Sequence, residues 1–317
     1  MRLRVETWDP AYGTSGEGVS ELGRSSAQVT LDVEVDRERW RPIDPDPNAP
    51  GWPAVLFVDG VRRIDAMAWV PGPATDPEAV SLALCASYAA GVVRCEPAGA
   101  RLLAADVRRG LFSTAGHAAD LATTAGRYRL VGVTARGEPG TDLNLAVQRE
   151  LADAEASVAS AAAGDELLVL DGPLRGRAHL PHALGFIKTH RSEYLPPAQH
   201  RMVGALGPGQ RTPVFALGTS WRRYSWYLKL PGGPGAPWAG VVRAECSAEL
   251  PVAEVVALAD RSQPMLGRYA STEYKDARAP QNLYPIAGLE RELRRRLGDR
   301  ALLYRAIRRA ASPGPLG

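Results

Sequence analysis

The chain has 317 residues, of which 45% are hydrophobic and 23% charged, and its formal net charge is +3. These values are ordinary for a globular protein, so they exclude a disordered or fibrous chain, and the length allows one large domain or two of average size. No run approaches the roughly 18 apolar residues of a membrane span. The N-terminus reads as an alternating strand and not as a signal peptide, so we expect a cytoplasmic protein with no membrane partner.

The three cysteines, Cys85, Cys95 and Cys246, are odd in number and lack the CxxC spacing of a zinc site. They lie in apolar or strand-like contexts, so we expect them in the core and predict neither a disulfide framework nor a zinc centre.

The first third of the chain contains mostly strand patterns. Two strand-like runs, Leu3–Trp8 and Val29–Val35, precede a proline-rich loop over 42–53. The apolar run Val55–Val58 then ends at Asp59-Gly60, and a second run covers Ile64–Val70, which predicts a strand, a tight turn and an antiparallel partner. We therefore divide the chain into an N-terminal β extension, residues 1–50, and a main domain, residues 51–317.

Further strands are predicted over 80–95 and 102–107, and over 127–134 after a short helix. From Thr141, a plausible N-cap, apolar residues recur at helical spacing until Gly164 ends the helix. Glu150 interrupts this apolar stripe and should face the sheet. The next strand, Leu167–Leu170, ends at Asp171, so the arrangement at Asp59 is repeated.

The rest of the chain alternates between the two element types. Strands are predicted over 184–188, 212–217, 224–230 and 240–246, and helices over 195–206, 252–263 and 287–310, the last broken near Gly298. The pattern predicts an α/β fold with a mixed sheet flanked by helices. Eight arginines crowd the last helical segment and favour either a phosphate or acidic-partner contact or a solvated helical face. They are Arg291, Arg294, Arg295, Arg296, Arg300, Arg305, Arg308 and Arg309.

The acidic residues at the strand ends suggest metal chemistry. A carboxylate at the end of an apolar strand is costly to desolvate unless it meets a cation or hydrogen-bond donors. If Asp59 and Asp171 end neighbouring strands and Glu150 reaches them from the covering helix, their oxygens suit Mg²⁺ or Mn²⁺. Two such ions support phosphodiester hydrolysis, one activating water and the other steadying the leaving oxygen. Alternatively, both aspartates are turn residues and Glu150 is solvated.

Basic residues on predicted strands extend this hypothesis. Lys188 and Arg243 suit contact with a scissile phosphate, or else a structural ion pair, such as one between Arg243 and the neighbourhood of Glu245. The segment Trp221–Tyr227 mixes aromatic residues with Arg222 and Arg223, as single-strand binders do, although a strand edge or dimer contact would explain it equally.

Five segments in order resemble the NurA family: Phe57-Val58-Asp59-Gly60-Val61-Arg62, Leu168-Val169-Leu170-Asp171-Gly172-Pro173-Leu174, Gly185-Phe186-Ile187-Lys188, Val242-Arg243-Ala244-Glu245 and Leu283-Tyr284-Pro285. The resemblance covers about residues 54–293, and the pairing of "VDG" with "LDGPL" is moderately specific. It implies an RNase H-like core, a manganese-dependent nuclease acting on DNA ends, a homodimer and a hexameric HerA-type ATPase partner.

The resemblance also implies roles for single residues. Asp59 and Asp171 bind metal, Glu150 is the acid on the intervening helix, and Tyr284 orients water or a phosphate oxygen. Arg62, Arg222 and Arg223 are the candidate nucleic-acid contacts. The family's histidine is absent about two helical turns after Tyr284, where this chain has Glu292, so Glu292 is either a fourth oxygen ligand or a sign of weakened activity.

Other functions remain as alternatives. The absent histidine motivates a non-catalytic adaptor that binds DNA or regulates an ATPase. An actin-like phosphotransferase would need a Gly/Ser/Thr-rich phosphate loop after Asp59, which Val61-Arg62-Arg63-Ile64 does not supply. A guided nuclease of the Argonaute type would need guide-binding modules for which the chain has no room.

Overall fold

The computed structural model describes residues 23–24, 27–73, 75–76, 78–180, 182–190, 192–232 and 238–311. The chain forms two compact units. The first contains the described residues within 1–57, 94–101 and 163–288, and the second contains those within 58–93, 102–162 and 289–317. The predicted strand Leu3–Trp8 lies outside the described residues.

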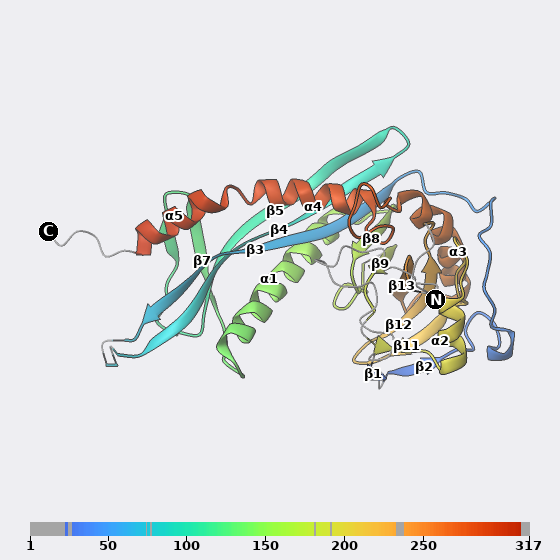
Figure 1. Ribbon diagram of the computed structural model, residues 1–317, viewed down its shortest axis with the longest axis horizontal. Coiled ribbons are helices and arrows are strands. Elements are labelled where there is room, and N and C mark those ends of the chain that lie inside the picture. Colours follow the sequence, from blue (N-terminus) through green and yellow to red (C-terminus); the bar gives the residue numbers. More distant parts are fainter. Residues whose placement is uncertain are drawn as a thin grey trace, which may run out of the picture. The chain divides into compact units, whose positions relative to one another are not determined.

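The first unit holds the two short strands before residue 31, the strands of the second half of the chain and the helices α2 and α3, labelled in Figure 1. Its elements are β1 (Gly23–Arg24), β2 (Gln28–Thr30), a short 3-10 helix (Arg37–Arg39), β8 (Leu167–Asp171), β9 (Ala183–Ile187), β10 (Ser192–Glu193), α2 (Pro197–Gly204), β11 (Phe215–Gly218), β12 (Arg222–Lys229), β13 (Val241–Ser247) and α3 (Val252–Tyr269).

The second unit holds β6 (Leu121–Thr123), β7 (Gly126–Gly132), α1 (Pro139–Ala162) and α5 (Arg300–Ala311). Four elements contribute residues to both units: β3 (Val55–Pro71), β4 (Val80–Glu96), β5 (Gly99–Ser113) and α4 (Tyr284–Arg296). The short helix predicted before Arg127 does not form. Instead β6 pairs antiparallel with β7, and Thr123 donates a hydrogen bond from Oγ1 to the Gly126 carbonyl at 2.6 Å across the turn.

β1 and β10 pair parallel in a small sheet of their own, and the other strands form a mixed sheet in the order β2-β11-β12-β13-β9-β8-β3-β4-β5-β7-β6. β8 and β9 are parallel, with Asp171 opposite Phe186, and β5 and β7 are parallel, whereas β9, β13, β12, β11 and β2 pair antiparallel in turn. The predicted fold class, an α/β protein with a mixed sheet flanked by helices, is confirmed.

One local prediction was wrong, and it concerns the strand that carries Asp59. β3 runs unbroken from Val55 to Pro71, so Asp59-Gly60 is not a hairpin turn and Asp59 does not end a strand. A hairpin would pair the two halves of this segment with each other. Both edges of β3 are already occupied, by β8 on one side and β4 on the other.

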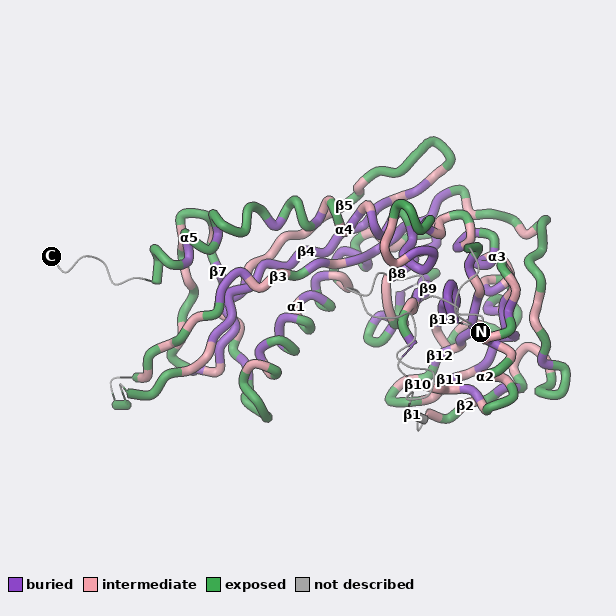
Figure 2. The backbone as a smooth tube through the Cα atoms, in the orientation of Figure 1, coloured by how far each residue is buried: buried purple, intermediate pink, exposed green. Residues whose placement is uncertain are grey.

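The middle strands of the sheet are buried on both faces. Residues 83–93 of β4 are buried without interruption, which Figure 2 shows as continuous purple. A strand with only one covered face would alternate between buried and exposed residues. In the second unit the covering elements include α1, which contributes Leu143, Val147 and Leu151 to the core, and α4, whose Leu289 and Leu293 lie against Gly91 of β4.

Gly60 of β3 lets α1 approach this strand closely. A Cβ atom at Gly60 would lie 2.6 Å from both Glu155 Oε1 and Leu151 Cδ1. Because both atoms would have to move, we expect Gly60→Ala to lower the free energy of unfolding by about 1–2 kcal/mol. Urea denaturation measures this loss. Gly132→Ala is the matched control, since Gly132 is a strand glycine with open space at its Cβ position, and equal losses in both variants would contradict the packing explanation.

The three cysteines are free and buried, as predicted. Burial raises the pKa of the Cys85 and Cys246 thiols to about 12, so neither is a thiolate at neutral pH.

Among the described residues, no helix combines the length and the apolar character that crossing a membrane would require.

Candidate functional site

Asp59 is a buried acid near the start of β3, and the residue is 7% exposed. The residues before it, Val55 to Val58, are buried and apolar. A carboxylate held in such a strand is costly to desolvate. Because a buried carboxylate at this position lowers stability, its presence points to a functional role.

Asp171 ends β8 beside a lysine. Its Oδ2 accepts a hydrogen bond from Lys188 Nζ at 2.6 Å, and the two side chains are 12% and 13% exposed. Lys188 directly follows β9, and Asp171 is the last residue of β8. Because β8 and β9 are parallel, the C-terminal ends of both strands lie on the same side of the sheet. Lys188 also donates to Asn282 Oδ1 at 3.1 Å, and Asn282 donates to Asp276 Oδ2 at 2.8 Å. The ammonium is therefore fixed in position by a chain of polar contacts.

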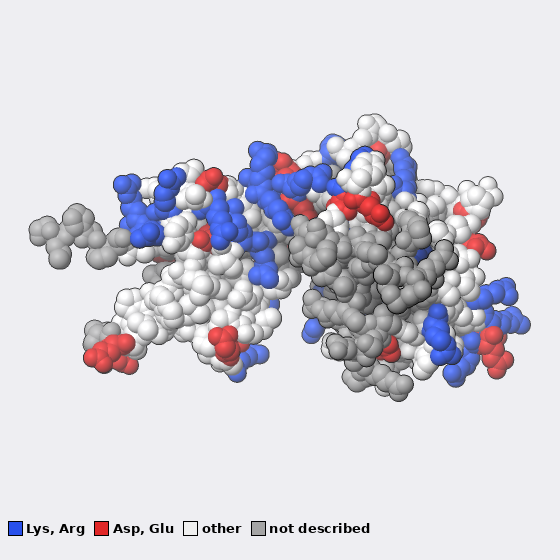
Figure 3. All heavy atoms as spheres, in the orientation of Figure 1, with Lys and Arg blue, Asp and Glu red and all other residues white. Residues whose placement is uncertain are grey.

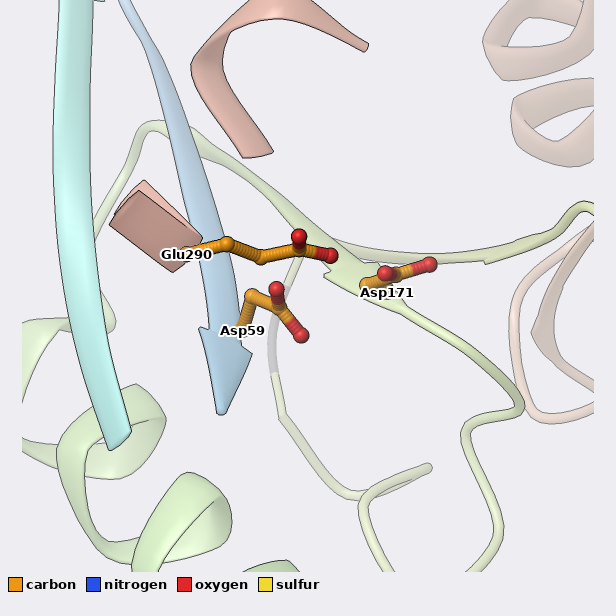
Figure 4. Close-up of side chains that lie close together, drawn as sticks. All are labelled: Asp59, Asp171 and Glu290. Carbon is orange, nitrogen blue, oxygen red and sulfur yellow. The ribbon is translucent and has the colours of Figure 1, made fainter. Parts of the chain in front are cut away.

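A third acid belongs with these two aspartates. Asp59, Asp171 and Glu290 each offer a carboxylate oxygen, and the three oxygens all lie within 4.8 Å of one another. Figure 4 draws these three side chains. Glu290 lies on α4, where Arg294 Nη2 is 3.7 Å from its Oε2. Three ionised carboxylates at such distances repel one another, and a divalent cation relieves that repulsion.

Glu150, the acid predicted to complete the group, is not part of it. The structure places its carboxylate beside Tyr88, whose hydroxyl donates a hydrogen bond to Glu150 Oε2 at 3.1 Å. Burial, and next the charge of Glu150, raise the pKa of the Tyr88 hydroxyl. The helical period correctly directs Glu150 toward the sheet, but its partner there is a tyrosine.

Glu292 is likewise absent from the acidic group. Its two oxygens accept hydrogen bonds from Arg295 and Arg296 at 2.7 to 2.9 Å on the surface of α4. These two guanidinium groups lower the pKa of Glu292 to about 2. Tyr284 begins α4 and is exposed, and its hydroxyl shares a hydrogen bond with Thr272 Oγ1 at 2.7 Å.

The arginines on β12 and β13 form a buried ion-pair cluster. Arg243 Nη1 donates to Glu245 Oε2 at 2.8 Å, and Arg223 Nε lies 3.1 Å from the same oxygen. The structural ion pair considered for Arg243 is therefore present. Glu245 Oε1 accepts the backbone N–H of Leu174 at 2.8 Å, which ties the loop after Asp171 to this cluster.

The remaining basic candidates lie on the surface. Arg62 of β3 and Arg222 of β12 are exposed, and Arg222 lines a cavity together with Gln28 and Thr30 of β2. All eight arginines of the C-terminal segment are exposed. Figure 3 shows Lys and Arg side chains gathered over α5 and the adjoining part of α4.

Three polar residues of this region were not among the site residues predicted from the sequence. Glu290 lies two residues before Glu292 in the same predicted helix, on a different face. Asn282 stands just before the Leu283-Tyr284-Pro285 segment and carries no charge to draw attention. Glu155 lies one helical turn beyond Leu151 on α1, and its Oε1 is close to Gly60, the residue after Asp59.

Comparison with known proteins finds a similarity among solved structures. No protein-family model matches the chain, and no curated protein matches it. Among solved structures, the NurA nuclease from Sulfolobus solfataricus is similar at 10% sequence identity and a TM-score of 0.49, over 87% of this chain and 89% of that chain. The function proposed for this protein therefore rests on its own residues.

Proposed function

We propose that this protein is a divalent-metal-dependent nuclease that hydrolyses phosphodiester bonds in DNA. The observation that carries the proposal is the group formed by Asp59, Asp171 and Glu290, whose oxygens lie within 4.8 Å of one another. A lysine on Asp171 and a nearby arginine cluster supply positive charge of the kind that a phosphate requires.

The donor set fits Mg²⁺ or Mn²⁺. All three residues offer hard carboxylate oxygens, and no thiolate or imidazole belongs to the group, so the set favours these ions over zinc. Asp59 and Asp171 come from strands, which hold side chains more rigidly than loops do. The number of ions, two by the resemblance to the NurA family, is part of the proposal.

The roles of the residues follow from their chemistry. Asp59, Asp171 and Glu290 would hold the metal, which when bound lowers the pKa of water and neutralises charge on the phosphate. Lys188 donates hydrogen bonds to Asp171 and Asn282 and has one further N–H donor for a phosphate oxygen. We assign Tyr284 a hydrogen bond to substrate, since its exposed hydroxyl is held by Thr272. Glu150 and Glu292 are paired with protein groups and receive no metal role.

Removing the metal tests this proposal first. Purified protein is expected to cleave labelled single- or double-stranded DNA in Mn²⁺ and to lose this activity in excess EDTA, with recovery when Mn²⁺ is restored. Cleavage that persists at full rate in EDTA would contradict it. DNA binding without hydrolysis in Mn²⁺ would instead support the non-catalytic adaptor.

The partners are proposed from the resemblance to the NurA family. We infer a homodimer that acts on DNA ends together with a hexameric HerA-type ATPase. The exposed arginines of α4 and α5 offer a surface for an acidic partner. Co-purification of the two proteins expressed together checks this assignment.

A further inference from the structure

The first unit also contains a polar cavity, and part of its lining is close in sequence to Asp171 and Lys188. A cavity of about 400 Å³ is lined by three arginines, Arg175, Arg223 and Arg243, by the aromatic rings of Tyr194 and Trp221, and by Thr219 among others. Pro173 and Ile187 also line it and lie two residues from Asp171 and one from Lys188. Its described lining includes no acidic residue. A volume of this size is typical of a small-ligand pocket.

Strand register brings the charged residues of this feature onto one face. Ser225 of β12 lies opposite Glu245 of β13, and Tyr227 lies opposite Arg243. Because side chains alternate along a strand, Arg223, two residues from Ser225, shares the face of Arg243 and Glu245. Two guanidinium groups thus meet one carboxylate, and both arginines are at most 5% exposed.

This cluster has a surplus of buried positive charge. Glu245 carries one negative charge for the two guanidinium groups that contact it. Their contacts with aromatic rings are weaker: Arg223 Cζ is 4.6 Å from the Trp221 ring centroid, and Arg243 Cζ is 5.1 Å from that of Tyr194. Burial lowers the pKa of Arg223. An uncompensated buried charge is expensive, which is why such charges are usually paired or serve a ligand.

The cluster also has donors to spare. Arginine has five N–H donors. Arg243 uses Nη1 for Ser225 and Glu245, and Arg223 uses Nη1 for Thr219. Among the described residues, neither Nη2 group donates a hydrogen bond. The fold therefore presents fixed guanidinium donors, charge and aromatic rings to one cavity, the combination that binds phosphate together with a base.

We propose that this cavity binds one nucleotide of a single-stranded DNA, with its phosphate on Arg175, Arg223 and Arg243 and its base against Trp221 and Tyr194. The inference rests on the proposed nuclease function, since it places a neighbouring nucleotide of the strand whose cleavage is assigned to Asp59, Asp171 and Glu290. In this arrangement, the ion pair with Glu245 holds the Arg243 guanidinium in position, and the Nη2 group remains available to donate to the phosphate.

Binding of a fluorescein-labelled oligothymidylate, followed by fluorescence anisotropy in EDTA across a salt series, tests the cavity. Arg175 is exposed, so the Arg175→Ala variant is expected to fold as the wild type does. It is expected to weaken binding about tenfold and to reduce the slope of log affinity against log salt by about 0.7. Trp221→Ala is expected to weaken binding about tenfold with the slope unchanged.

The control is Arg39→Ala, an arginine that is 78% exposed and absent from the cavity lining, and it should bind as the wild type does. Wild-type affinity in both Arg175→Ala and Trp221→Ala would overturn the proposal. The affinity for thymidine monophosphate, measured by tryptophan fluorescence, shows whether the cavity binds a DNA strand or a free nucleotide. It should bind at least about tenfold more weakly than the oligomer because it makes fewer phosphate contacts, and equal affinity would overturn the assignment to a strand.

Measuring binding in EDTA keeps this test apart from cleavage. If the wild type cleaves DNA and the cavity variants bind DNA normally, only the proposal for the cavity is overturned. Cavity-dependent binding by a protein that shows no cleavage in Mn²⁺ overturns only the nuclease function.

Discussion

Asp171→Asn is expected to reduce Mn²⁺-dependent DNA cleavage by about 10³-fold or more. Asparagine keeps the shape of the side chain and still accepts the hydrogen bond from Lys188, but it removes a negative charge from the group with Asp59 and Glu290. Losing about 4 kcal/mol of transition-state stabilisation corresponds to this factor. Initial rates at saturating Mn²⁺ measure it.

Asp165→Asn is the matched control for this substitution. Asp165 is an exposed carboxylate just before β8, so its variant should cleave at the wild-type rate. Circular dichroism and urea denaturation of both variants establish that each is folded. A folded Asp171→Asn variant that cleaves within about threefold of the wild type would remove Asp171 from the metal site.

A comparison of Glu290→Gln with Glu150→Gln separates the two candidates for the third acid. Glu290→Gln is expected to raise the Mn²⁺ concentration for half-maximal cleavage by about tenfold or more, because a charged oxygen ligand is replaced by a neutral one. Glu150→Gln is expected to change it less than about twofold. Glutamine can still accept the Tyr88 hydroxyl hydrogen bond that Glu150 accepts.

Glu292→Gln serves as the control on the same helix as Glu290. Its carboxylate is held by Arg295 and Arg296, so Mn²⁺ titration of this variant should resemble the wild type. The opposite pattern, with Glu150→Gln impaired and Glu290→Gln normal, would identify Glu150 of α1 as the third metal ligand and would exclude Glu290 from that role.

Hydrophobic pattern was sufficient to predict most elements. The helical repeat from Leu143 to Val158 appears as α1, and the apolar run before Asp171 appears as β8. The pattern failed at Asp59-Gly60, because Asp-Gly is a turn signal whose outcome depends on whether the flanking segments pair with each other. Here β8 and β4 occupy both edges of β3, and that long-range pairing cannot be read from a local window.

The acidic group was predictable only in part for a related reason. Asp59 and Asp171 follow apolar runs, so a strand pattern locates both. Glu290 lies on α4, more than a hundred residues beyond Asp171, in a segment whose many arginines indicate a solvated surface. Its neighbour Glu292 is bound by those arginines, and Glu290 is 14% exposed. A shift of two residues on a helix changes the face by about 200°, so choosing between them required coordinates.

The most direct test of the metal site is anomalous diffraction at the manganese edge from crystals of the wild-type protein grown with Mn²⁺. An anomalous peak is expected within about 2.1 Å of carboxylate oxygens of Asp59, Asp171 and Glu290, and no such peak in crystals of Asp171→Asn. Wild-type crystals whose manganese peaks all lie away from these three carboxylates would contradict the assignment of a metal-dependent nuclease to this group.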